Sequence, residues 1–181
     1  MTAAPRPRGP GRVLVIGYGN ALRTDDGVGW HAARLLAGDP RLAGAVVVAE
    51  QQLAPELALD MSAATLVVLV DATTTTKPGT VTVRQLAAPG EESAGAGSGA
   101  SGTGPGATSH HVDPGLLLAL ARELYGAAPE AVEVSVGVAD VGPGETLTPL
   151  VAAALPAVAD AVARLVEEHE GRANGVPREP A

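Results

Sequence analysis

The chain has 181 residues, of which 46% are hydrophobic, and its formal net charge is −8 at pH 7. This length suits one domain with a core of its own, and the hydrophobic content excludes an intrinsically disordered chain. The acidic balance excludes bulk attraction to nucleic acid or to an anionic membrane. Cysteine is absent, which excludes disulfides, thiolate metal sites and cysteine nucleophiles.

The start of the chain and its short apolar runs predict a cytoplasmic protein. Residues 1–11, rich in Pro and Arg, are expected to form a flexible leader that lacks the apolar stretch of a signal peptide. No apolar run is long enough to predict a membrane span. A monomer is the expected oligomeric state.

The first half of the chain alternates predicted strands and helices. The aliphatic run at 13–17 predicts a strand that is buried on both faces. A helix is expected from about Gly27 to Asp39, and its apolar stripe would consist of Val28, Ala32, Leu35 and Leu36. The next predicted elements are a strand at 45–49, a short helix at 55–61, a buried strand at 65–71 and a half-exposed edge strand at 80–86.

The second half begins with a low-complexity stretch at 88–107, which has little to bury and is expected to form a mobile Gly/Ser-rich insertion. Asp113 and Pro114 predict the start of a helix that ends at Gly126. Its expected buried face consists of Leu116, Leu117, Leu120 and Leu124. A last strand at 132–138 and a final helix that opens at Thr148-Pro149 and is kinked by Pro156 complete the domain.

This order of elements predicts an α/β fold. Strands that alternate with helices form a mostly parallel sheet, here of about five strands, with helices on both faces as a three-layer sandwich. A single domain is expected to span residues 12–170, followed by a flexible tail at 171–181. In such sheets ligands bind outside the carboxyl ends of the strands, so functional side chains are expected at that edge.

Three segments place ionisable side chains at this edge. Asp25 and Asp26 follow the first strand, Asp71 ends the third, and His110 and His111 precede a helix. Each has a structural alternative: a turn cap for Asp71, helix N-terminal residues that complement the macrodipole for Asp25 and Asp26, and simple exposure for the histidines. Together, an imidazole and two carboxylates favour a site for a divalent metal such as nickel, zinc, manganese or iron.

Other ionisable residues are weaker candidates. Glu50 ends the second strand and Asp140 follows the last, so both are expected near the same edge. His31 lies inside a helix and is interpreted as structural. His169 lies among glutamates and is interpreted as solvated.

A glycine-rich turn follows the first strand. Gly17-Tyr18-Gly19 matches the start of the dinucleotide-binding pattern G-x-G-x-x-G. The third glycine is absent, because Leu22 occupies its position. The turn is therefore only a weak indication of a nucleotide-dependent enzyme.

Four segments carry a more specific pattern: VLVIGYGNALRTDDGVG (13–29), LVVLVDA (66–72), SHHVDPGLLLAL (109–120) and GETLTPLVAAAL (144–155). They resemble the hydrogenase maturation protease family, whose signature is roughly G-x-G-N-x-L-x-x-D-[DE]-G-x-G. With the order of elements, the resemblance spans about residues 12–168. The sequence departs from it at 50–53, where Glu-Gln-Gln-Leu replaces the D-G-G-T of many relatives, and in the length of its Gly/Ser insertion.

The resemblance implies an endopeptidase that removes the C-terminal peptide from the nickel-loaded precursor of a nickel-iron hydrogenase large subunit. It assigns both metal contact and catalysis to Asp26, Asp71 and His111. Nickel is expected to arrive with the precursor, and the attacking water would be activated by the metal or by Asp26. Asn20 and Glu50 are expected to act in substrate binding. The alternative is a non-catalytic chaperone that binds nickel or the precursor on the same scaffold.

Overall fold

The computed structural model describes residues 12–87, 112–127, 129–173 and 175. The predicted leader and the Gly/Ser-rich insertion lie outside these residues, and so do His110, His111 and most of the predicted tail. The described residues hold every predicted strand and helix.

Five strands within the described residues form one sheet in the order β2-β1-β3-β5-β4. They are β1 (Val13–Tyr18), β2 (Val46–Glu50), β3 (Leu66–Thr73), β4 (Val81–Leu86) and β5 (Glu130–Gly137). The first three and β5 pair in parallel, whereas β4 pairs antiparallel with β5 at one edge. The mostly parallel sheet and its edge strand are therefore confirmed.

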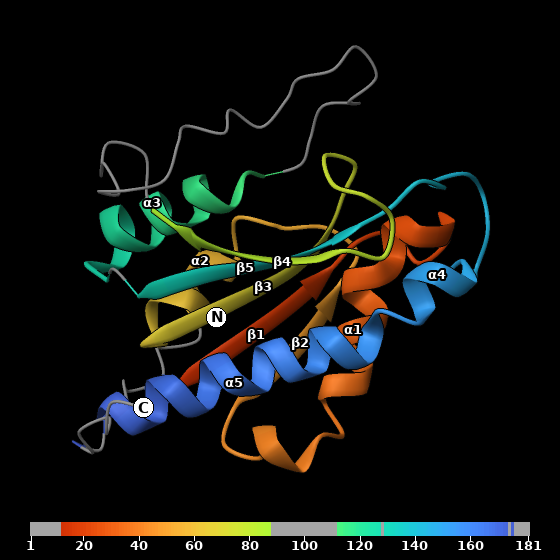
Figure 1. Cartoon of the computed structure of the whole chain (residues 1–181). Helices are drawn as coiled ribbons and strands as arrows, with labels where there is room; N and C mark the ends of the chain where they lie inside the picture. Colours follow the sequence, from red (N-terminus) through yellow and green to blue (C-terminus); the bar gives the residue numbers. More distant parts are fainter. Residues whose placement is uncertain (1–11, 88–111, 128, 174, 176–181) are drawn as a thin grey trace.

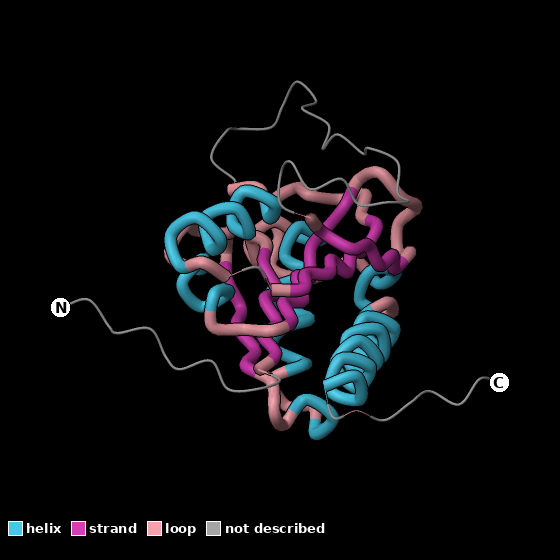
Figure 2. The backbone as a smooth tube through the Cα atoms, turned by 90° about the vertical axis from the view of Figure 1, so that its left-hand side faces the viewer, coloured by secondary structure: helices cyan, strands magenta, loops and turns pink. Residues whose placement is uncertain are grey.

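Helices cover both faces of the sheet, as Figures 1 and 2 show. One face packs against α1 (Val28–Leu36), α4 (Pro149–Ala152) and α5 (Leu155–Ala173); the other packs against α2 (Leu57–Ser62) and α3 (Pro114–Tyr125). Two 3-10 helices, η1 (Thr24–Gly27) and η2 (Pro40–Leu42), flank α1. The predicted three-layer α/β sandwich is confirmed.

The central strands are apolar on both faces because each face has its own layer of helices. In β1, Val13 and Val15 pack on the side of α1 and α5, whereas Leu14 packs on the side of α2 and α3. Side chains alternate along a strand, and Leu69 of β3 belongs to the second cluster. Asp71, two residues later, therefore emerges on the side of α2 and α3.

Two glycines set the distance between α1 and the sheet. A Cβ atom on Gly29 would lie 2.2 Å from the carbonyl oxygen of Val70 and 2.3 Å from that of Tyr18. A Cβ atom on Gly17 would lie 2.0 Å from the carbonyl oxygen of Gly29. The glycines of the sequence signature therefore serve close helix–sheet packing at these positions.

Replacing Gly29 with alanine is expected to lower the free energy of unfolding by about 3 kcal/mol, because two backbone carbonyls cannot move aside as a flexible side chain can. Gly38→Ala is the matched control, since a Cβ atom there meets only the Leu35 carbonyl oxygen, at 3.7 Å. Urea denaturation followed by circular dichroism measures both variants. A loss below about 1 kcal/mol for Gly29→Ala would contradict the close packing.

The predicted helix faces are wrong at three leucines. Leu35 of α1 is 49% exposed, and Leu116 and Leu124 of α3 are 48% and 64% exposed. In α3, Leu118 and Ala121 are buried instead. A leucine-rich helix offers more than one apolar stripe, so the position of the sheet decides which stripe is buried.

The boundaries of α3 are those predicted. Asp113 caps the helix by accepting hydrogen bonds from the backbone N–H groups of Gly115 and Leu116. Gly126 ends it with φ of +64°, a conformation that favours glycine. The start of α3 is thereby held by a short polar side chain next to the sheet edge where the candidate site lies.

The C-terminal helix is broken where the sequence places Pro156. α4 ends at Ala152 and α5 begins at Leu155, because a proline inside a helix lacks an N–H donor and clashes with the preceding turn. Among the described residues, only Pro149–Ala173 has the length and hydropathy of a membrane span. Its valines, including Val158 and Val162, are buried against the sheet, and covering the core accounts for that hydropathy. α5 also continues past residue 170, where the domain was predicted to end.

The His169 side chain is only 12% exposed, and the prediction that it is solvated is wrong. Its Nε2 lies 2.9 Å from Thr65 Oγ1 and its Nδ1 lies 3.4 Å from the Glu130 carboxylate. Glu130 also forms an ion pair with Arg172. α5 places these groups over the amino ends of β3 and β5, so they lie at the opposite edge of the sheet from the candidate site.

Candidate active site

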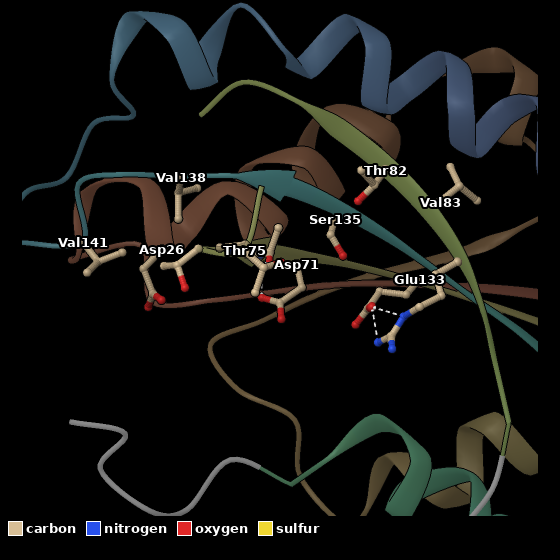
Figure 3. Close-up of a pocket in the computed structure, with 13 residues that line it drawn as sticks. Asp26, Asp71, Thr75, Thr82, Val83, Glu133, Ser135, Val138 and Val141 are labelled. Atoms are coloured by element: carbon tan, nitrogen blue, oxygen red, sulfur yellow. Dashed lines mark hydrogen bonds and ion pairs between the residues drawn. The ribbon is translucent and has the colours of Figure 1, made fainter. Parts of the chain in front are cut away.

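A pocket of about 660 Å³ opens at the carboxyl end of β3, beside β4 and β5 (Figure 3). Four separate segments line it, and they contribute Asp26 from η1, Asp71 from β3, Arg84 from β4 and Glu133 from β5. The carboxylates of Asp26 and Asp71 point to the same side of the sheet. The structure therefore brings together two of the side chains that the sequence places at separate strand ends.

Asp71 lies where β3 leaves the hydrophobic core, and burial raises the pKa of its carboxyl group to about 7. Hydrogen bonds from the Tyr18 hydroxyl and from the Ala72 N–H, 2.7 Å away, favour the charged form but do not offset burial. The neighbouring charges of Glu133 and Asp26 raise the pKa further. A cation bound beside Asp71 would therefore relieve an electrostatic cost that is built into the fold.

Tyr18 supports Asp71 from β1, and sequence reasoning missed it. Its side chain is only 7% exposed. Burial, followed by the charge of Asp71, raises the pKa of the phenol far above its usual value. Tyr18 therefore remains a protonated donor to Asp71 at any working pH. The G-x-G pattern gives no sign of this role, because it constrains the two glycines and leaves the residue between them unspecified.

Replacing Asp71 with asparagine is expected to raise the free energy of unfolding by about 2 kcal/mol at pH 8. The folded chain binds a proton at Asp71 more tightly than the unfolded chain does. Ionisation therefore costs stability as the pH rises from about 4 to about 7, and the cost persists above pH 7. Asparagine stays neutral and avoids it. Urea denaturation at pH 8 and pH 4 should show the gain only at pH 8; an equal difference at both pH values would contradict the burial of the charge.

Asp26 is held in the pocket by the loop that follows β1. Its Oδ2 accepts a hydrogen bond from the Asn20 backbone N–H at 3.2 Å. The Asn20 side chain accepts one from the Leu22 N–H at 2.9 Å, which closes a tight turn. In the structure Asn20 therefore orients the loop that carries Asp26, while its predicted role in substrate binding stays a prediction.

Asp25 has a different role from its neighbour. Its side chain is 1% exposed. One carboxylate oxygen accepts a hydrogen bond from the Thr148 backbone N–H at 2.7 Å, and the other accepts one from the Thr148 hydroxyl at 3.0 Å. Thr148 is the N-cap residue of α4, so Asp25 joins the site loop to the start of that helix. Asp25 therefore does act at a helix N-terminus, which was the structural alternative for this residue. The helix is α4, however, and not α1, which follows Asp25 in the chain.

Backbone hydrogen bonds extend this connection between the loop after β1 and the loop after β5. The Thr24 N–H bonds to the Gly144 carbonyl at 2.9 Å, and the Gly144 N–H bonds to the Leu22 carbonyl at 3.0 Å. The Asp25 N–H bonds to the Asp140 carbonyl at 3.0 Å. Asp26 is therefore held by two chain segments, although it lies in a loop.

Arg84 and Glu133 form the other end of the pocket. The guanidinium donates from Nε at 3.2 Å and from Nη2 at 2.7 Å to one oxygen of Glu133, which is 9% exposed. Thr82 and Ser135, which are paired in register, line the wall between this ion pair and Asp71. Sequence reasoning missed all four residues, because β4 and β5 become neighbours only in the folded sheet.

The same architecture occurs in solved structures. The hydrogenase maturating endopeptidase HybD of Escherichia coli superposes with a TM-score of 0.65 at 23% identity, over 87% of this chain and 93% of that one. The nickel-iron hydrogenase maturation protease HycI of Thermococcus kodakarensis gives 0.64 at 19% identity, over 88% and 94%. This chain has the fold of the hydrogenase maturation proteases. No protein-family model and no curated protein matches its sequence.

Within the described part of this hydrogenase maturation protease fold, the predicted metal cluster is incomplete. No group of three His, Asp or Glu side chains there is placed to hold a metal ion. Asp26 and Asp71 line the pocket, and His111 lies outside the described residues. The three-residue site therefore stays a prediction.

The other predicted residues that the structure describes do not line this pocket. Glu50 ends β2, two strands away from β3, where its backbone carbonyl accepts a hydrogen bond from the Gly19 N–H at 3.2 Å. Asp140 is exposed and caps a turn by accepting from the Gly142 N–H at 2.9 Å. His31 lies on α1. A substrate-binding role for Glu50 stays a prediction.

The glycine-rich turn of this fold leaves no room for a dinucleotide phosphate, and the side chains beside it carry negative charge. Gly19 has φ of +139°, and a Cβ atom there would lie 1.9 Å from the carbonyl oxygen of Asp26. The chain itself thus occupies the space next to the turn. The carboxylates of Asp25 and Asp26 stand before α1, where a dinucleotide-binding fold receives the anionic pyrophosphate. The structure disfavours the nucleotide interpretation.

Proposed function

We propose that the chain is an endopeptidase that removes the C-terminal peptide from the nickel-loaded precursor of a nickel-iron hydrogenase large subunit. The observation that carries the proposal is the meeting of Asp26 and Asp71 in one pocket at the carboxyl edge of this fold. The likeness to structures of hydrogenase maturation proteases supports the reaction class. The partner is accordingly the precursor protein, and the setting is the cytoplasm.

The carboxylates suit the recognition of a nickel ion that arrives as part of the substrate. Oxygen donors from Asp26 and Asp71, with an imidazole from His111, form a donor set that accepts first-row divalent metals. The raised pKa of Asp71 means that a positive charge beside it is favourable. A precursor without nickel would leave these two neighbouring negative charges without a compensating cation. Such a site selects the matured precursor before cleavage.

Cleavage requires a water molecule and a polarised carbonyl next to these groups. Nickel in the precursor would supply Lewis-acid chemistry at the scissile carbonyl. In this proposal Asp26 takes the proton of the attacking water. Asp71 stays in place through Tyr18 and Ala72 and faces the metal-bearing part of the substrate.

The test compares nickel-loaded and nickel-free precursor with the purified full-length chain. We expect shortening of the loaded precursor, measured by mass spectrometry, and at least about 100-fold slower cutting of the nickel-free form. Equal cutting of both forms would refute the nickel dependence. Binding of the precursor without any cutting would favour the non-catalytic chaperone.

A further inference from the structure

The outer edge of β4 carries backbone groups that face away from the sheet. The Gly137 N–H donates to the Thr80 carbonyl at 2.8 Å, and Thr82 and Arg84 follow Thr80 at two-residue intervals in register with β5. In an antiparallel pair, alternate residues direct their N–H and C=O groups to the partner strand. The backbone groups of Val83 and Gln85 therefore point to the free edge.

Within the described residues, this edge lacks the features that usually protect an outer strand. β4 contains no proline, pairs with β5 in continuous register and runs for six residues. Val83 is 51% exposed. Its charged residue, Arg84, is tied to Glu133 and turned toward the pocket. In the described part of the chain, no other strand pairs with this edge. An edge of this kind is a template for an extended peptide.

The free edge is continuous with the candidate active site. Thr82, Val83 and Arg84 line the same pocket as Asp26 and Asp71, and Figure 3 shows β4 along one side of it. We propose that an extended segment of the hydrogenase precursor adds to β4 as a further antiparallel or parallel strand; this inference rests on the proposed function. Backbone hydrogen bonds to Val83 and Gln85 hold the segment, so recognition there is largely independent of its sequence.

The sheet geometry sets how far this segment lies from the scissile bond. Asp71, Ser135 and Thr82 are cross-strand neighbours on β3, β5 and β4. Adjacent strands are about 4.8 Å apart, so an added strand lies about 14 Å from Asp71. An extended chain covers about 3.4 Å per residue. The bound segment therefore begins about four residues from the bond that is cut.

Amide hydrogen exchange tests the proposal directly. The probe is the nickel-loaded precursor, added in excess to the wild-type full-length chain and labelled while uncut precursor still saturates the site. The Val83 and Gln85 amides should exchange readily in the free chain and at least about tenfold more slowly in the complex. The Thr82 and Arg84 amides, which already bond to β5, should change little.

A proline at position 83 provides a second measurement. Val83→Pro removes the N–H that faces the free edge and leaves the β4–β5 hydrogen bonds intact, as is tolerated on edge strands. We expect precursor binding at least about tenfold weaker, with the urea midpoint almost unchanged. Val83→Thr keeps the N–H and the strand preference, and should bind as the wild type does.

Several outcomes would overturn the added strand. The first is slow exchange of the Val83 and Gln85 amides in the free chain. The second is protection of these amides that grows with the concentration of the chain alone, which would indicate pairing with a second copy. The third is a complex that adds no protection to the β4 amides. Failure to form any complex would overturn it too. Wild-type cleavage, measured in parallel, separates the two proposals. Cutting without β4 protection refutes the added strand alone, and β4 protection without cutting refutes the proposed reaction alone.

Discussion

Asparagine at position 71 is expected to abolish processing of the nickel-loaded precursor, with a rate at least about 1000-fold below that of the wild type. The substitution keeps the shape of the side chain and its ability to accept from Tyr18 and Ala72. It removes only the negative charge that faces the pocket. The loss is measured by mass spectrometry of the large subunit at matched enzyme concentrations.

The same variant separates loss of activity from loss of fold, because Asp71→Asn is expected to be more stable than the wild type at pH 8. Asp26→Asn should lose processing as well. Asp60→Asn, an exposed position on α2, is the matched control and should cut normally. If Asp71→Asn retains more than about a tenth of the wild-type rate, the acidic pair is not the centre of the reaction.

Alanine at position 25 is expected to lower the free energy of unfolding by about 3 kcal/mol. Asp25 is buried, and its two oxygens satisfy both the N–H and the hydroxyl of Thr148. Without the carboxylate, both donors and the start of α4 lose their partner. Urea denaturation of the purified variant gives the loss. Asp26→Ala, one residue away and partly exposed, should change stability by less than about 1 kcal/mol.

A double-mutant cycle assigns the effect to the contact itself. Thr148→Ala alone removes the hydroxyl but keeps the backbone N–H, so it should cost less than Asp25→Ala. The double variant should be less destabilised than the sum of the single variants by about 1 kcal/mol or more, because both changes remove the same hydrogen bond. Additive losses would mean that Asp25 stabilises the fold through other groups.

The two neighbouring aspartates show why a motif can be right while the role of each residue is left open. Asp25 and Asp26 look alike in the sequence, and both stand before α1. In the fold, Asp25 turns inward to Thr148 and Asp26 turns to the pocket. The direction of each side chain depends on the backbone of η1 and on the hydrogen bonds of η1 with the loop after β5. That loop lies more than a hundred residues further along the chain.

The order of strands and helices, the burial of β1 and β3 on both faces, the caps of α3 and the break at Pro156 were all determined by local sequence. Each of these depends on periodicity or on the conformational limits of one residue type, and both act within a few positions of the chain. Asp71 could be nominated for the same reason, because it ends a recognisable apolar run, and Asp26 because it lies between the first apolar run and the first helix.

Only the tertiary structure decided which residues complete the pocket. Tyr18 reaches Asp71, and Arg84 and Glu133 line the same pocket as Asp71, because β1, β3, β5 and β4 lie side by side. No local pattern specifies that order. The raised pKa of Asp71 likewise depends on burial and on charges from distant segments. Contacts between residues far apart in sequence come from the packing of whole elements, which local preferences do not encode.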